Sequence, residues 1–117
     1  MTSSFCTAVF ATLSLSGSAA LAQATSPTAG GGPAEEGRAL AQTCRVCHGL
    51  DGVGTNPMIP NIGGQNSDYL SKQLQDFRAE RREDPQMTII ARDLSDEDIA
   101  RLAAWYASIE TSYKMPD

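Results

Sequence analysis

An all-α fold is predicted for this chain of 117 residues by three features of its sequence. Apolar residues recur at helical spacing in three separate segments. No stretch of β-branched residues alternates with polar ones, as a half-buried strand would. Glycine and proline are concentrated between the helical segments, and the length leaves room for one domain. We therefore expect three main helices joined by long loops.

The first 22 residues are typical of a secretory signal peptide. They carry no Lys, Arg, Asp, Glu or His, and they end in Ala20-Leu21-Ala22, which fits an A-x-A processing site. A membrane anchor is the alternative, but serine and threonine dilute the stretch and it barely reaches spanning length. Residues 23–33 have the Gly- and Pro-rich composition of a flexible linker. The mature chain is thus expected in the periplasm, with no membrane span and with its folded domain in residues 34–117.

Each expected helix has its own apolar pattern. The first, over residues 34–46, lacks proline and repeats four residues on one face: Gly37, Leu40, Ala41 and Cys44. The second follows Ser67, a candidate N-cap, and carries Leu70, Leu74 and Phe77. The third follows residues 95–98, Ser-Asp-Glu-Asp, which resemble a capping box. Its apolar stripe contains Ile99, Leu102, Ala103, Tyr106 and Ile109.

Charge and size narrow the possible functions. The formal net charge of −5 argues against nucleic acid, because binding phosphate requires clustered Lys and Arg. It is compatible with a protein that meets basic partners. A domain of about 84 residues, 34–117, buries a modest core and often needs a disulfide, a metal or a prosthetic group. Three thin helices alone would pack poorly, so we expect a group at the centre.

The segment Cys44-Arg-Val-Cys47-His48 indicates which group this is. Zinc needs four ligands, and two cysteines with one histidine fall short by at least one. A thioredoxin-like pair would follow a strand in a βαβ unit, and a plain disulfide would leave His48 unexplained. C-x-x-C-H is the pattern of covalent haem attachment, in which both thiols form thioethers and the histidine binds the iron. We favour one covalently bound haem c, attached through Cys44 and Cys47.

Longer stretches resemble a known family. They read CRVCHGLDGVG, IPNIGGQ, YLSKQLQDFRAERR and MTIIARDLSDEDIARLAAWYASI, and together they cover nearly all of residues 36–110. The sequence is similar to the class I c-type cytochromes of bacteria, within the short branch that includes dihaem periplasmic cytochromes and the haem subunits of flavocytochrome c sulfide dehydrogenases. The resemblance implies a class I cytochrome c fold, in which three main helices and long loops wrap around one haem.

The resemblance also implies the second iron ligand, a methionine opposite His48. Met58 lies too close to His48 in the sequence, and Met115 lies in a tail. Met87 lies ahead of the last helix, where the family has its ligand, and we expect it in a loop; filling a gap in the core is its alternative role. Met and His together raise the reduction potential of haem.

Further residues acquire roles from the same resemblance. The backbone carbonyl of Pro60 would accept a hydrogen bond from the imidazole of His48, and Ile62 would pack on the porphyrin face. Gly37 would let the first helix cross the last closely, against Trp105 or Tyr106. A charged run with Arg78, Arg81 and Arg82 is interpreted as a solvated face, with a contact to haem or to a partner as the alternative.

The expected function is electron transfer, with no catalytic residue. The redox partners would be a donor dehydrogenase and a terminal oxidase or reductase. One alternative is the haem subunit of a periplasmic dehydrogenase complex, for example one that oxidises sulfide or an alcohol. Another is a haem sensor whose iron has an open position. The sequence offers no nucleophile with an adjacent base, so chemistry beyond the cofactor's own is not expected.

Overall fold

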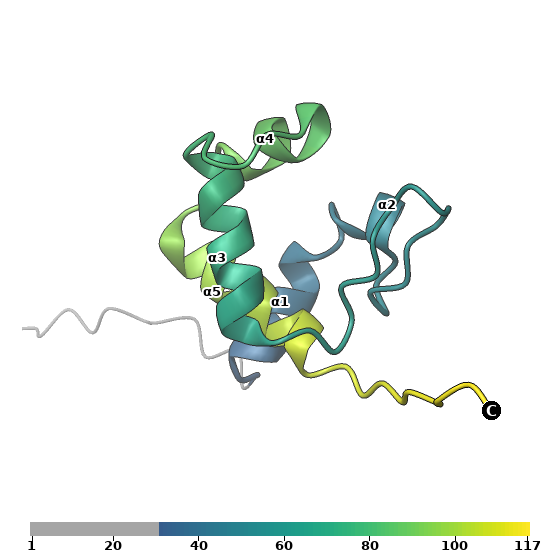
Figure 1. The fold of residues 1–117 in the computed structure, drawn as a ribbon. Helices are drawn as coiled ribbons and strands as arrows, with labels where there is room; N and C mark the ends of the chain where they lie inside the picture. Colours follow the sequence, from purple (N-terminus) through teal and green to yellow (C-terminus); the bar gives the residue numbers. More distant parts are fainter. Residues whose placement is uncertain (1–30) are drawn as a thin grey trace, which may run out of the picture.

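The computed structural model describes residues 31–117, and within that range the chain forms five helices and no strand (Figure 1). They are α1 (Pro33–Leu40), α2 (Arg45–His48), α3 (Ser67–Arg78), α4 (Pro85–Ala91) and α5 (Asp96–Ala107). The prediction of an all-α fold is confirmed. The expected signal peptide and most of the expected linker lie outside the described residues. None of the helices in residues 31–117 has the length and apolar character needed to cross a membrane.

The predicted helix over residues 34–46 is not continuous. It begins at Pro33, whose fixed φ suits the first helical position, and α1 ends at Leu40. The amides of Gln42 and Thr43 then bond to carbonyls three residues back, each at 3.4 Å. Such tighter turns change the direction of a helix. They separate the short helix α2 from α1, so the cysteine pair lies on its own helical turn.

Helices α1 and α5 cross in direct backbone contact. A Cβ atom added to Gly37 would lie 1.9 Å from the carbonyl oxygen of Arg101 and 2.9 Å from the Cβ of Trp105. No side chain fits in that space, so the predicted close crossing at Gly37 is confirmed. Helix α3 packs against the same helix α5. The buried cluster between these elements contains Ala41, Leu70, Leu102, Ala103 and Tyr106.

The starts of α3 and α5 are fixed by capping side chains. Asn66, and not the expected Ser67, caps α3: its side chain accepts hydrogen bonds from the amides of Asp68 and Tyr69. The capping box predicted for α5 is present, because Ser95 and Asp98 each accept from the backbone amide of the other. Each cap satisfies amides that a helix start leaves unpaired.

Helix α4 was not expected, and it contains Met87, which the sequence suggested would lie in a loop. Asp84 caps the helix by accepting hydrogen bonds from the amides of Gln86 and Met87, at 2.9 and 2.8 Å. Pro85 occupies the first turn, where its missing amide hydrogen costs nothing. Within the described part of the chain, α4 packs against α3 and no other helix, and α2 packs against none. Figure 1 shows α2 and α4 as separate extensions from the bundle of α1, α3 and α5.

Candidate functional site

The two cysteines lie on one turn of helix. Cys44 is the N-cap residue of α2 and Cys47 lies within it, and both are half-buried free thiols. Burial raises the pKa of the Cys44 thiol, and the neighbouring Cys47 acts in the same direction, so Cys44 is held in its neutral form. The amides of Cys47 and His48 both bond to the Cys44 carbonyl, at 3.2 and 3.0 Å. This turn therefore fixes the spacing of the two sulfurs and the imidazole.

The imidazole of His48 is buried, with 8% of the residue exposed, and its Nδ1 lies 2.9 Å from the carbonyl oxygen of Pro60. A carbonyl oxygen only accepts hydrogen bonds, so Nδ1 carries the hydrogen and donates it. In the neutral ring, Nε2 then keeps its lone pair and is available to a metal. The contact fixes both the tautomer and the plane of the ring, as the resemblance implied for Pro60.

The loop after α2 is fastened to α5 by two aromatic side chains. Trp105 Nε1 donates to the carbonyl oxygen of Leu50 at 3.1 Å, and the hydroxyl of Tyr106 donates to that of Gly49 at 3.1 Å. Burial raises the pKa of the Tyr106 phenol, so this group stays a hydrogen-bond donor across the physiological range. The sequence predicts only a packing role for Trp105 and Tyr106, because no local motif indicates their hydrogen bonds to Leu50 and Gly49.

The loop also folds back on itself, and this places Pro60. The amides of Ile62 and Gly63 donate to the carbonyl of Gly52 at 2.7 and 3.1 Å, and the amide of Gly54 donates to the side chain of Asn61 at 2.8 Å. Gly52 has a φ of 75°, which favours glycine. Ile62 is half-buried and packs against the core cluster. Three bonds made by the residues directly after Pro60 therefore hold this part of the loop in place, and with it the Pro60 carbonyl that contacts His48.

The three methionines in the described range differ in burial. Met87 is half-buried, whereas Met58 is 88% exposed and Met115 is 81% exposed. The amide of Met87 is bonded to the Asp84 cap, so its backbone has a fixed place in the first turn of α4. Asp84-Pro85 is a recognisable helix start, and it was the sequence feature that could have revealed α4.

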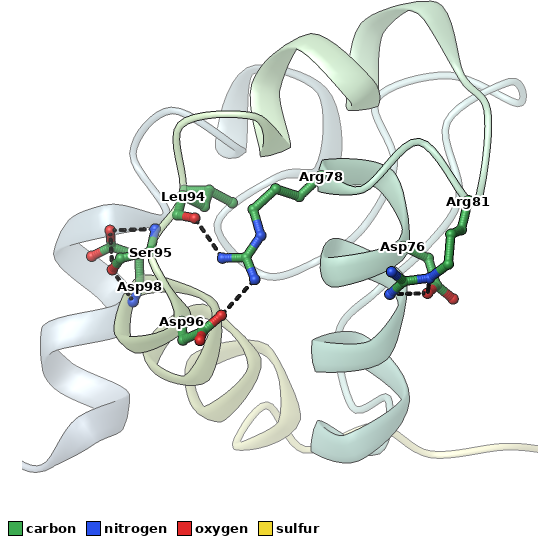
Figure 2. Close-up of polar contacts among 7 residues, drawn as sticks. All are labelled: Asp76, Arg78, Arg81, Leu94, Ser95, Asp96 and Asp98. Carbon is green, nitrogen blue, oxygen red and sulfur yellow. Dashed lines mark hydrogen bonds and ion pairs between the residues drawn. The ribbon is translucent and has the colours of Figure 1, made fainter.

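Two arginines of the charged run, Arg78 and Arg81, form ion pairs and hydrogen bonds with other residues of the chain (Figure 2). Arg78 donates to the carbonyl oxygen of Leu94 at 2.8 Å and pairs with Asp96 at 2.5 Å. Arg81 pairs with Asp76 at 2.8 Å, and Lys72 reaches the same carboxylate. These cations hold the pKa of the Asp76 carboxyl below its usual range, Lys72 more strongly than Arg81. The side chain of Arg81 stays 61% exposed, as expected of a solvated face, whereas that of Arg78 is 29% exposed and connects α3 to α5.

No group of three or more His, Cys, Asp or Glu side chains able to hold a metal ion occurs in residues 31–117. The groups gathered near α2 are two thiols and one imidazole with a free Nε2. The sulfur of Met87 belongs to a different segment, on α4.

The family model described as cytochrome c matches residues 34–110. Cytochrome c4 of Pseudomonas aeruginosa is 41% identical over 86 residues, which are 74% of this chain and 43% of that protein. Cytochrome c-554(548) of Halomonas halodenitrificans is 43% identical over 82 residues, 68% of this chain and 99% of that protein. The chain thus spans about half the length of the cytochrome c4 it matches, and nearly the whole of the shorter relative.

The fold of this chain is also similar to that of a solved cytochrome structure. The crystal structure of reduced recombinant cytochrome c4 from Pseudomonas stutzeri superposes with a TM-score of 0.59 at 32% sequence identity. The match covers 67% of this chain and 48% of that one.

Proposed function

The chain belongs to the cytochrome c family, and we propose that it carries single electrons between redox proteins through a haem c held by Cys44, Cys47, His48 and Met87. The family's cofactor is covalently bound, and the spacing of the two cysteines fits one haem. When bound, haem supplies one-electron chemistry. The residues described below hold it, orient its ligands and limit access to it.

The observation that carries the proposal is the hydrogen bond from His48 Nδ1 to the carbonyl oxygen of Pro60. In this bond Nδ1 donates its hydrogen to the protein backbone, so the lone pair of Nε2 would be available to bind iron. An acceptor on the far side of the ring also increases its basicity. Pro60 thus has the role of orienting the proximal ligand.

The two cysteines fit covalent attachment. Both are free thiols, and one helical turn separates their backbones. Because the thiol of Cys44 is kept neutral by burial, it is protected from ready oxidation, which proceeds through the thiolate. Ile62 completes this side as an apolar wall next to the core cluster.

Met87 would supply the second protein ligand to the haem iron in this proposal. Its partial burial distinguishes it from the two exposed methionines, and its fixed place in α4 suits a ligand that must not move when the charge of iron changes. Closing the sixth position makes the protein an electron carrier and not a sensor that binds small ligands. No residue is assigned to catalysis.

A signal peptide in residues 1–22 would send the chain to the periplasm, and its partners there would be a donor dehydrogenase and a terminal oxidase or reductase. The net charge of −5 suits partners with a basic docking face.

Replacing Met87 with alanine tests the ligand assignment. The purified Met87→Ala protein should keep its covalent haem but lose the thioether–iron band at the red end of the ferric spectrum. Its reduction potential should fall, because thioether ligation raises it. Met58→Ala is the matched control and should leave both unchanged, since that side chain is 88% exposed. An unaltered spectrum in Met87→Ala would exclude Met87 as the ligand.

Purification of the native protein separates the carrier from the complex subunit. A free carrier elutes from size exclusion without a second chain and exchanges electrons with more than one redox protein. A stable complex with a dehydrogenase chain would instead identify this protein as a haem subunit of that enzyme.

A further inference from the structure

The segment that carries Met87 has few attachments of its own. Helix α4 contains seven residues, of which only Ala91 is buried, while Ile89 is 63% and Ile90 is 37% exposed. Among the described helices it packs against α3 alone. Few buried contacts mean a low free energy of local opening. What holds this segment closed must therefore come from its two ends.

Arg78 joins those ends. It is the last residue of α3, and its guanidinium donates to the carbonyl oxygen of Leu94, 16 positions further along the chain, at 2.8 Å. The same group pairs with Asp96 in the first turn of α5 at 2.5 Å. Figure 2 shows the guanidinium reaching across to both. One side chain thus closes the base of the segment that contains α4 and Met87.

The carbonyl contact is the stronger of the two attachments. The side chain of Arg78 is 29% exposed, so its bond to Leu94 is partly shielded from water. A hydrogen bond that involves a charged group contributes more than a neutral one. The side chain of Asp96 is 80% exposed, and ion pairs in water contribute little. The planar fork of arginine serves both acceptors at once, which lysine does not do.

We propose that Arg78 is a positioning residue, which keeps the sulfur of Met87 on the iron by closing the 79–93 segment at its base. This inference rests on the proposed function, because it takes Met87 as the sixth ligand. Loss of Arg78 would let the segment open more often without unfolding α1, α3 and α5. An external ligand would then reach the iron more easily, since its apparent affinity rises with the open fraction.

Imidazole titration of the haem-loaded ferric protein tests this. In Arg78→Ala, the imidazole concentration that removes half of the thioether–iron band should fall about tenfold, equivalent to about 1.4 kcal/mol of opening free energy. Arg82→Ala is the matched control, with the same charge change nearby. Arg82 lies in the 79–93 segment and attaches it to α3, because it stacks over Phe77 and bonds to Gln73, but it makes no bridge to α5. It therefore controls for the loss of a cation and of a contact to α3. Its midpoint should stay within about twofold of the unaltered protein.

An unchanged midpoint in Arg78→Ala, or an equal change in Arg82→Ala, would overturn the proposal. Thermal unfolding of the same samples checks that the assay is run on folded protein. If the alanine variant does not accumulate with haem, Arg78→Lys decides: a fall of at least about twofold supports the proposal and no fall refutes it. The proposed ligand fails separately, through an unchanged spectrum in Met87→Ala.

Discussion

At the scale of single residues, the sequence predicts those residues of the site that lie next to one another in the chain. In the proposed function, Cys44, Cys47 and His48 hold one cofactor from a single helical turn, so five consecutive residues of the sequence define them. The hydrogen bond from His48 to Pro60 spans 12 positions, and it was anticipated only through resemblance to a family. The bond from Arg78 to Leu94 was not anticipated, because its acceptor is a backbone carbonyl that no sequence pattern marks.

The cap of α3 shows the same limit on a smaller scale. Asn66 and Ser67 are adjacent and both are good capping residues, so propensity alone does not separate them. The structure selects Asn66 because its side chain reaches two amides.

Asp76 provides a prediction at this scale. Its carboxyl has a lowered pKa in the folded protein, first through Lys72 and then through Arg81. A lowered pKa means that the charged form stabilises the fold above the unfolded value, near 4, and that this contribution is lost as pH falls through the folded value. Asp76→Asn should therefore lower the urea midpoint at pH 6, and the difference from the unaltered protein should shrink below about pH 4.

Urea denaturation followed by circular dichroism at pH 3 to 7 measures this difference. Arg81→Gln serves as the companion variant, since it removes one of the two cations and keeps the carboxylate. A difference that is independent of pH would mean that Asp76 acts by shape and not by charge.

At the scale of elements, apolar periodicity predicts α3, α5 and the start of α1, but it predicts neither the break after Leu40 nor helix α4. The stripe that suggested one helix over residues 34–46 continues across the turn at 41–44, because a tight turn changes direction while leaving apolar residues on nearly the same side. Helix α4 is not predicted by periodicity, because seven residues are too few to show a helical repeat. Its start was nonetheless marked by Asp84 and Pro85.

The crossing of α1 and α5 yields a prediction for elements. Alanine in place of glycine inside a helix normally gains about 1 kcal/mol. At Gly37 the added Cβ would meet the Arg101 carbonyl at 1.9 Å, and a backbone atom cannot rotate away. We expect Gly37→Ala to destabilise the protein by about 2 kcal/mol or more, since overpacking outweighs propensity.

Thermal and urea unfolding of the haem-loaded variant measure the effect. Gly32→Ala is the control for open space, because a Cβ at Gly32 would meet nothing within 4 Å. Gly32 is the N-cap of α1, so this variant should lose only the small difference between glycine and alanine at a cap. A Gly37→Ala protein as stable as the unaltered one would show that the two helices separate at little cost.

At the scale of the whole molecule, the described chain consists of a three-helix bundle, α1, α3 and α5, and two short helices, α2 and α4, outside it. Helices α1, α3 and α5 pack together, whereas α2 packs against no helix in residues 31–117 and α4 only against α3. The three-helix bundle could be predicted, because its helices bury apolar residues that recur at helical spacing in the sequence. The placement of α2 and α4 could not be predicted, because it depends on individual hydrogen bonds between residues far apart in the sequence. These bonds join Tyr106 to Gly49, Trp105 to Leu50, and Arg78 to Leu94.

One of these bonds gives the molecule an internal optical reporter. Trp105 is the chain's single tryptophan. Its indole N–H donates to the carbonyl oxygen of Leu50, which lies two positions after His48 in the sequence. Porphyrins absorb where indole emits, so excitation energy passes from one to the other over short distances. The loaded protein should be nearly dark in tryptophan fluorescence, and a Cys44→Ser/Cys47→Ser double variant purified without haem should be bright. Recovery of emission in urea would then time the release of the α2 region from α5 in a protein that needs no added label.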